Sequence, residues 1–376
     1  MMRRLLPATA LMLALSAGVS YGQRVQVASE QEQWILGEYW TVVKRYQSGQ
    51  TAPAIKEISS WPQDRIAKVQ ASQFQQETQL NDLRMSKTEW RPGTLRSAAM
   101  LHTEAGLEAL RQRDISQFQF HVGIADGWLS LADDRKSIPG GLRSRWNVAV
   151  ARVLLLNGEF SLAEASLERV NTKIADDAAV LLALGTAKES RALRMTADAP
   201  AGAKPRDPAE VRRERAELRA AAASLFERAL ALSPAMAEAR LRLARLAMDR
   251  GDDARAEQEL RAVTQASADP GHVYLVHIWL GDIRERQKQW TAAAESYVEA
   301  VKARPDGQSA YVALAHALYE MGQRVQAAGV MDRWFARGVT NPVADPWWVY
   351  PLGLDARLEA RFDAIFAEVK AAKDAK

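Results

Sequence analysis

Apolar residues in this chain recur at intervals of three and four, the spacing that lines one face of an α-helix. The segment 354–373 is a clear example, because its large apolar residues follow this spacing: Leu358, Phe362, Ile365, Phe366 and Val369. Long β-branched runs of the kind that form strands are missing. We therefore predict an all-α protein.

A longer pattern repeats through the second half of the chain. A leucine or valine followed by a small residue recurs at Val150-Ala151, Leu184-Gly185, Leu243-Ala244, Leu280-Gly281 and Leu314-Ala315. The intervals 150–184 and 280–314 are both 34 residues long. Later in each unit an alanine is followed four positions on by a large apolar residue: Ala163 by Leu167, Ala222 by Phe226, Ala256 by Leu260, Ala293 by Tyr297 and Ala327 by Met331.

This pattern resembles the tetratricopeptide repeat, a 34-residue pair of antiparallel helices. The segment 274–307 matches best, with Leu280-Gly281, Trp290 and Pro305 beside Ala293 and Tyr297. The resemblance places five units at about 144–177, 178–236, 237–273, 274–307 and 308–341. It implies a right-handed α-solenoid, in which units stack because none of them buries its apolar faces alone.

Glycine and proline mark the turns and the ends of this array. Gly158, Gly251 and Gly322 follow predicted helices, where a positive φ is expected. The unit 178–236 carries an insertion at about 197–215, rich in proline and alanine and then in charge. We interpret it as a surface insertion, and the alternative is an arm that contacts a partner.

The flanking regions are less regular. Residues 23–142 predict further helices, and we interpret them as a degenerate, repeat-like region before the array at 143–341. After it, 342–376 holds an aromatic strip, Trp347–Leu352, and the helix predicted at 354–373. We interpret strip and helix as the C-terminal cap of the open end of the solenoid. The alternative is that the strip is a docking site.

The N-terminus predicts export. Arg3 and Arg4 precede an uncharged apolar stretch, and Ser20 and Gly22 supply small residues before a cut at Gln23. This layout is typical of a cleavable signal peptide at 1–22, with an uncleaved anchor as the alternative. We therefore expect a periplasmic or secreted protein with no integral membrane segment after cleavage.

Composition and chemistry narrow the function. A net charge of +4 is too balanced for a nucleic-acid-binding face, and without cysteine the chain has no disulfide or thiolate metal site. Hydrolase, zinc-protease, P-loop and dinucleotide motifs are missing. We therefore expect no enzyme, no cofactor and no metal. The alternative is a cryptic enzyme within 23–142, for which His102, Glu104 and His121 are the candidates.

The resemblance implies a partner-binding groove along the first helix of each unit. Aligning the units gives these candidates: Arg145, Val148, Arg152, Leu182, Leu241, Arg245, Ile278, Asp282, Val312, His316 and Tyr319. The five apolar members share one register, which favours an amphipathic helix or an apolar peptide as the partner, unless superhelical curvature buries them. We therefore predict a non-catalytic scaffold for a protein or peptide. The alternative, suggested by eleven tryptophans, is a cell-wall or carbohydrate-binding accessory component of an envelope enzyme complex.

Overall fold

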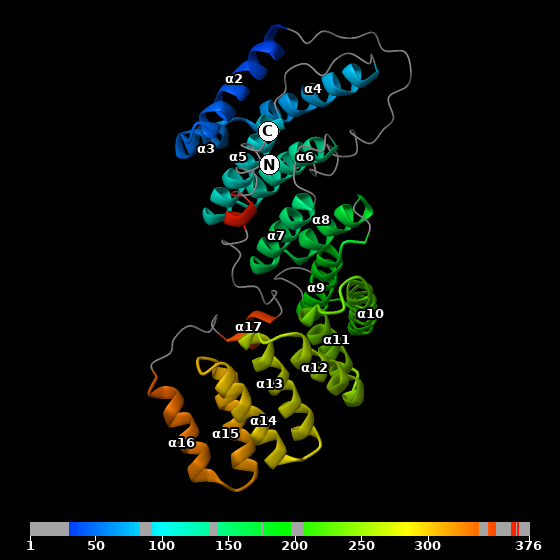
Figure 1. The fold of residues 1–376 in the computed structure, drawn as a ribbon, viewed down its shortest axis with the longest axis vertical. Helices are drawn as coiled ribbons and strands as arrows, with labels where there is room; N and C mark the ends of the chain where they lie inside the picture. Colours follow the sequence, from blue (N-terminus) through cyan, green and yellow to red (C-terminus); the bar gives the residue numbers. More distant parts are fainter. Residues whose placement is uncertain are drawn as a thin grey trace. The chain divides into compact units, whose positions relative to one another are not determined.

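The computed structural model describes residues 30–82, 92–134, 141–173, 176–196, 206–337, 345–350, 362–365 and 367. These residues form helices and the turns between them, with no strand (Figure 1), and the all-α prediction is confirmed. The chain divides into two compact units, Met1–Ser137 and Ile138–Lys376. Within the described part, no helix has the length and apolar character needed to cross a membrane.

Unit 1 contains five described helices. Their bounds are α2 Glu30–Gln47, α3 Thr51–Ser60, α4 Gln63–Asp82, α5 Pro92–Arg111 and α6 Ile115–Asp134. The closest packing is between α5 and α6, which a short turn connects. The large side chains of Tyr39, Phe118 and Trp128 are fully buried and form the centre of this unit.

The described part of unit 2 contains five helix pairs, the short helix α17 (Pro346–Val349) and a helical turn at 362–365. The pairs are α7 Leu142–Leu156 with α8 Phe160–Lys173, α9 Ala178–Arg194 with α10 Pro208–Leu232, α11 Ala237–Asp249 with α12 Asp253–Ala266, α13 Pro270–Arg286 with α14 Trp290–Ala303, and α15 Gln308–Glu320 with α16 Arg324–Phe335. Each predicted repeat contains one pair, and successive pairs stack in chain order (Figure 1). The α-solenoid prediction is confirmed.

Local signals set the ends of these helices. Asp177 begins α9 by accepting hydrogen bonds from the backbone N–H groups of Ala179 and Val180, at 2.9 and 3.1 Å. Asp207, Asp252 and Asp269 cap α10, α12 and α13 in the same way, and such a cap contributes about 1 kcal/mol. The predicted turn glycines Gly158, Gly251 and Gly322 have φ values of 81°, 77° and 77°.

The small residues of the repeat pattern lie where helices meet. Gly185 on α9 packs against the ring of Phe226 on α10, and Gly281 on α13 packs against the ring of Tyr297 on α14. A Cβ atom at either glycine would overlap the ring. The spacing of small and large residues in the sequence is therefore a direct record of helix packing.

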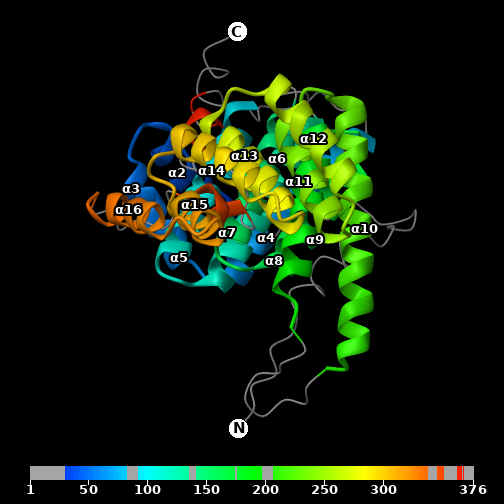
Figure 2. The ribbon, with the colours of Figure 1, turned by 90° about the horizontal axis from the view of Figure 1, so that it is seen from below.

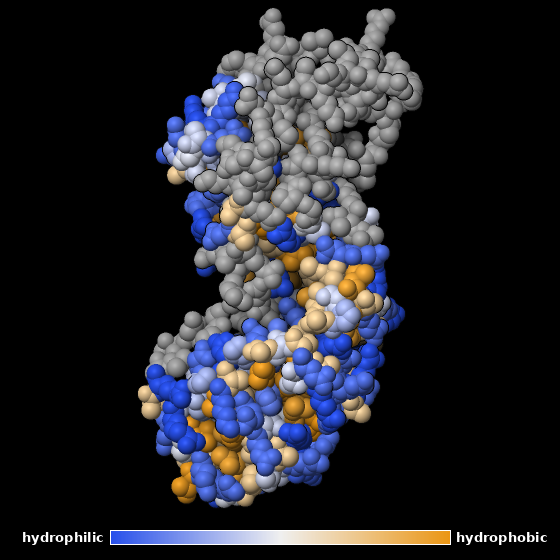
Figure 3. Space-filling view, in the orientation of Figure 1, coloured by the Kyte–Doolittle hydropathy of each residue, from blue (hydrophilic) through white to orange (hydrophobic). Residues whose placement is uncertain are grey.

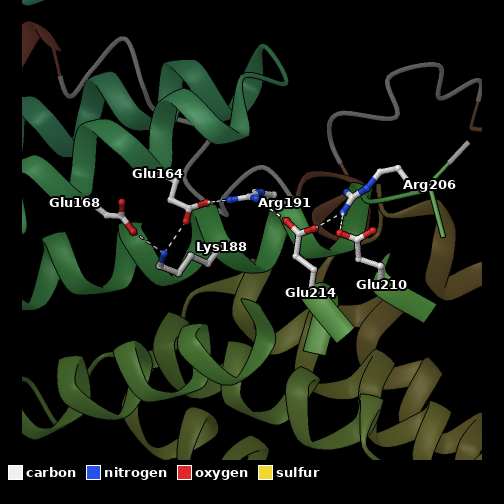
Figure 4. Close-up of polar contacts among 7 residues, drawn as sticks. All are labelled: Glu164, Glu168, Lys188, Arg191, Arg206, Glu210 and Glu214. Carbon is white, nitrogen blue, oxygen red and sulfur yellow. Dashed lines mark hydrogen bonds and ion pairs between the residues drawn. The ribbon is translucent and has the colours of Figure 1, made fainter. Parts of the chain in front are cut away.

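The insertion lengthens the second helix of its repeat. Residues 197–205 lie outside the described part, and the remainder is Arg206 with the first turns of α10, which project past α11 and α12 (Figure 2). A row of ion pairs fastens these turns (Figure 4). It runs through Glu168, Lys188, Glu164, Arg191, Glu214 and Arg206, with N–O distances of 2.6 to 3.0 Å.

The predicted C-terminal helix and the signal peptide fall mostly outside the described residues. Residues 362–365 are helical, and the side chains of Phe362 and Ile365 are buried. Just after the array, α17 spans Pro346–Val349.

Candidate partner-binding site

A short segment after the array lies on the first helices of the repeats. We call residues 345–350 the strap. It begins at Asp345, whose buried carboxylate accepts hydrogen bonds from the backbone N–H of Ser309 on α15, at 2.7 Å, and of Trp347, at 3.0 Å. The helix of the strap, α17, then packs against α13. The strap is thus anchored at its start to the last repeat of the array.

The strap ends at Tyr350, in a pocket built by three repeats. The phenol O–H donates to Glu189 Oε1 on α9 at 2.7 Å, and Arg242 Nη2 on α11 donates to the Tyr350 carbonyl at 3.2 Å. The guanidinium of Arg242 lies over this ring, 4.7 Å from its centroid, and the Trp279 ring on α13 packs nearly perpendicular to it, with the two ring centroids 5.1 Å apart. Every side chain of this pocket is more than nine-tenths buried.

Arg242 is the centre of a buried charge cluster. Its Nη1 donates to Glu189 Oε2 at 2.6 Å, and its Nε and Nη2 donate to Glu238 Oε1 at 3.2 and 3.0 Å. Arg152 Nη2 donates to the other oxygen of Glu238 at 3.4 Å. Two cations thus face two anions, and such balance is what allows charges to remain buried.

The charges in this cluster set its protonation. Burial alone would raise the pKa of Glu238, but the positive charges of Arg152 and Arg242 lower it to about 2. Burial, followed by the nearby Glu189 carboxylate, raises the pKa of Tyr350 well above 10. At neutral pH, therefore, Glu238 is ionised and Tyr350 keeps the proton that it donates to Glu189.

The middle of the strap contacts a partly exposed surface. The guanidinium of Arg245 lies over the ring of Trp347, 5.5 Å from its centroid, and Trp347 is half-buried against the core of the last repeats. With Tyr350, these contacts extend over α9, α11 and α13. Trp347 and Tyr350 of the predicted aromatic strip therefore lie on the first helices of the second, third and fourth repeats, the surface that we call the inner face.

The predicted apolar stripe is largely buried, which corrects its reading as an accessible groove. Val148, Leu182, Leu241 and Ile278 have exposed fractions of 2%, 7%, 0% and 5%. They pack between neighbouring helices of the stack. Of the five residues, only Val312 is accessible, with an exposed fraction of 47%. It lies on α15, the first helix of the last pair.

The polar members of the predicted groove have mixed positions. Arg152 is buried in the charge cluster, whereas Arg145 is exposed and Arg245 and Asp282 are partly exposed. On α15, His316 and Tyr319 are exposed on the same face as Val312. We call Val312, His316 and Tyr319 the α15 face. His316 Nδ1 bonds Glu285 of α13 at 3.1 Å, which ties this face to the preceding repeat.

Repeat alignment also places Glu189 and Glu238 on the first helices that line the predicted groove, and Tyr350 belongs to the predicted aromatic strip, but sequence reasoning missed Arg242. One signal was available for Arg242, since it directly precedes the small-residue pair Leu243-Ala244. The equivalent positions before the other pairs hold only apolar or aromatic residues, such as Ala183, Trp279 and Ala313. A lone arginine at a buried repeat position indicates a buried acidic partner.

A second exposed surface lies over α14, α15 and α16. A groove of about 550 Å³ is lined by apolar side chains and by charged ones at its edge: Ala294, Val298, Leu314, Leu318, Val330, Glu295, Glu299 and Arg333. Figure 3 shows hydrophobic surface over α15 and α16. Of the described helices, only α15 packs extensively on α16.

The candidate enzyme residues of unit 1 do not form one site. His102 and His121 do meet, with their Nδ1 atoms 2.8 Å apart, and His102 Nε2 lies 3.0 Å from the Tyr39 hydroxyl. Both histidines are buried, and Glu104 is bound instead by the hydroxyl of Tyr46. Burial lowers the pKa of His102 well below 6.5 and that of His121 to about 4, so this pair is neutral at pH 7. The described residues hold no group of three or more potential metal ligands.

Comparison with known proteins agrees with the repeat pattern. Residues 216–276, from within α10 to within α13, match the tetratricopeptide repeat family. Among solved structures, MamA from Desulfovibrio magneticus RS-1 is 18% identical and is covered over 99% of its length by 54% of this chain, with a TM-score of 0.38. MamA AMB-1 is 22% identical and is covered over 92% by 49% of this chain, with a TM-score of 0.35.

No curated protein sequence matches the chain. Since the TM-scores lie below 0.5, the assignment rests on the family match and on the stacked helix pairs rather than on these overlays. Residues 216–276 are therefore tetratricopeptide-repeat sequence, and they lie within an array of stacked helix pairs.

Proposed function

We propose that this protein is a non-catalytic scaffold of the periplasm or cell envelope, which holds a protein or peptide partner on the inner face of its array. Tetratricopeptide repeats are protein-interaction scaffolds, and this coarser role follows from the family. One observation carries the finer proposal: the inner face already holds a polypeptide segment, the strap, through side chains from several repeats.

The α15 face is an exposed surface on which a partner can bind first. Val312 and Tyr319 are 47% and 53% exposed, and His316 lies between them on the helix surface. Glu285 borders this face, and Arg324 lies over the Tyr319 ring, 5.5 Å from its centroid. Apolar and aromatic groups flanked by both charges suit an amphipathic segment of polypeptide.

The burial of tryptophan disfavours the carbohydrate alternative. A sugar-binding platform needs exposed flat rings. Of the described tryptophans, Trp61, Trp290 and Trp347 are partly exposed, but Trp40, Trp128, Trp146, Trp279 and Trp334 are each at most 7% exposed. These rings fill helix interfaces. We therefore prefer a polypeptide partner.

The location is proposed from the N-terminus. The charged, apolar and small-residue regions of 1–22 support export and cleavage before Gln23. N-terminal sequencing of protein from the envelope fraction should begin at Gln23. Retention of Met1, with the chain in the cytosol, would contradict the proposal.

Site-specific crosslinking tests the partner. A photo-reactive amino acid replaces Tyr319 on the α15 face, and a matched control replaces Leu232 at the end of α10, which is 47% exposed. In intact cells we expect a discrete polypeptide adduct at 319 that is missing at 232. No adduct at 319, or the same set of adducts at both positions, would contradict the proposed function.

A further inference from the structure

The Tyr350 pocket holds a phenol hydroxyl against a buried carboxylate. Glu189 is 1% exposed, and its two carboxylate oxygens receive hydrogen bonds from Arg242 and from the Tyr350 hydroxyl. If the hydroxyl is removed, a buried carboxylate oxygen loses a donor that water reaches poorly. Hydrogen bonds to buried charged groups are strong, so tyrosine should bind here about tenfold or more tighter than phenylalanine.

The strap is held by contacts that another polypeptide could reproduce. Its helix spans four residues, and two residues anchor it: Asp345, which accepts a hydrogen bond from the first turn of α15, and Tyr350, which fills the pocket. Trp347 over Arg245 adds a third contact between them. A segment from another molecule with an acidic residue five positions before a tyrosine would offer the same groups in the same order.

The strap and a segment from another molecule could not occupy the Tyr350 pocket together. The pocket surrounds a single ring, between Arg242 and Trp279, and Glu189 has one oxygen for one phenol. A tethered strap acts as a competitor at high effective concentration. The apparent affinity for a second segment is its intrinsic affinity multiplied by the fraction of molecules in which the Tyr350 pocket is free.

We propose that the strap is an internal competitor: the inner face binds partner segments that carry an acidic residue and, five positions later, a tyrosine, and the strap must leave to admit them. This inference rests on the proposed scaffold function and specifies the partner chemistry at the same face. It makes the chain a scaffold that restrains its own binding.

A labelled synthetic peptide of residues 343–352 provides the probe. Fluorescence anisotropy measures its binding to the intact chain and to three variants: Asp345→Ala/Tyr350→Ala, Tyr350→Phe and the surface control Val325→Ala. Val325 is 84% exposed on α16. We expect the double variant to bind the peptide at least tenfold tighter than the wild type, Tyr350→Phe to show an intermediate gain, and Val325→Ala to match the wild type.

Two further measurements keep the test decisive. A peptide with phenylalanine at the tyrosine position should bind the double variant about tenfold more weakly, and adding Glu189→Gln, which keeps an acceptor but removes its charge, should reduce that preference. Circular dichroism reports folding, and if the double variant is unfolded, Tyr350→Phe, which keeps the ring, decides alone. The inference is overturned if the folded double variant and Tyr350→Phe bind the peptide no more tightly than the wild type does. It is also overturned if the double variant binds the tyrosine and phenylalanine peptides equally.

The crosslinking experiment separates the two ideas. If position 319 captures a polypeptide equally in the wild type and in Tyr350→Phe, the scaffold function stands and the internal competitor is overturned. If the peptide binds as expected but position 319 captures nothing in cells, the competitor stands and the proposed cellular function fails.

Discussion

At the scale of single residues, close packing in the array joins a glycine on one helix to an aromatic ring on its partner. Gly281 lies against Tyr297 so closely that no Cβ fits, whereas Gly329 on α16 has no atom within 4 Å of an added Cβ. The same change at the two positions therefore has opposite consequences. Only the first glycine is required by packing.

We predict that Gly281→Ala lowers the free energy of unfolding by about 1–3 kcal/mol, because the ring of Tyr297 must shift. Gly329→Ala should raise it by up to about 1 kcal/mol, since alanine favours the helix. Urea denaturation followed by circular dichroism measures both. Equal effects of the two substitutions would mean that the glycine–ring contact does not determine packing.

The buried arginine supports a second prediction at this scale. Arg242→Met leaves Glu189 and Glu238 buried without their main cation, which should cost about 3–5 kcal/mol. Arg245→Met, at a partly exposed arginine one turn away, should cost less than about 1 kcal/mol. Restoring part of the loss with Glu189→Gln in the Arg242→Met background would identify the unpaired carboxylate as the cause. The idea fails if the two arginine variants unfold at the same urea concentration.

At the scale of elements, the extra turns of α10 depend on charge rather than on a core. Between Arg206 and Glu217 only Val211 is buried, and Arg191 links Glu164 of α8 to Glu214 of α10 (Figure 4). Partly exposed ion pairs contribute little to global stability, but they order the segment that they hold.

Arg191→Gln should therefore raise amide hydrogen exchange in the first two turns of α10 and change the global free energy of unfolding by no more than about 1 kcal/mol. Mass spectrometry of exchanged peptides covering 208–215 measures this. Arg213→Gln, whose pair with Glu217 is exposed, is the matched control and should leave that exchange unchanged. Added salt should imitate the effect of Arg191→Gln, because it screens the pairs.

The helix pairs could be predicted from the sequence because their causes are local. A turn glycine, a capping aspartate and a small residue four places before a large apolar one each act within one helix pair, and Gly251, Asp252 and Ala256 illustrate all three. Because the fold is periodic, these signals recur in every unit. A unit whose own signals are weak can therefore be located from the spacing of its neighbours.

The contacts of the strap could not be predicted in the same way because they are long-range. Tyr350 and Glu189 are 161 residues apart, and no spacing rule connects them. The residues that meet the strap are also the neighbours of the predicted stripe rather than the stripe itself. Leu241 and Ile278 point between helices, while the adjacent Arg242 and Trp279 meet the strap, and one residue corresponds to about 100° around a helix.

At the scale of the whole molecule, the two compact units respond to acid through different groups. In unit 1, burial holds the pKa of His102 well below 6.5 and that of His121 at about 4. As the pH falls, these histidines are therefore protonated in the unfolded state at a higher pH than in the folded state. Stability of unit 1 is then complete above about pH 6.5 and declines as the pH falls. In unit 2, Glu238 has a pKa of about 2 against an ordinary 4.5, so its contribution is lost only below about pH 4.5. Burial also lowers the pKa of His277, but its partial exposure makes that effect smaller.

We therefore predict that acidification opens unit 1 before unit 2. Between pH 6.5 and 4, each buried histidine should lower the unfolding free energy of unit 1 by up to about 1.4 kcal/mol per pH unit, because unfolding takes up its proton. Hydrogen exchange, corrected for the intrinsic pH dependence of amide exchange, should rise in α5 and α6 while α11 and α13 remain protected to about pH 4.5. His121→Gln removes one of the two titrating groups and should reduce the slope of unit 1, whereas His316→Gln, on the exposed α15 face, should not. If the helices of both units lose protection together in the wild type, or if His121→Gln leaves the slope unchanged, the buried histidine pair is not the acid-sensitive element of this protein.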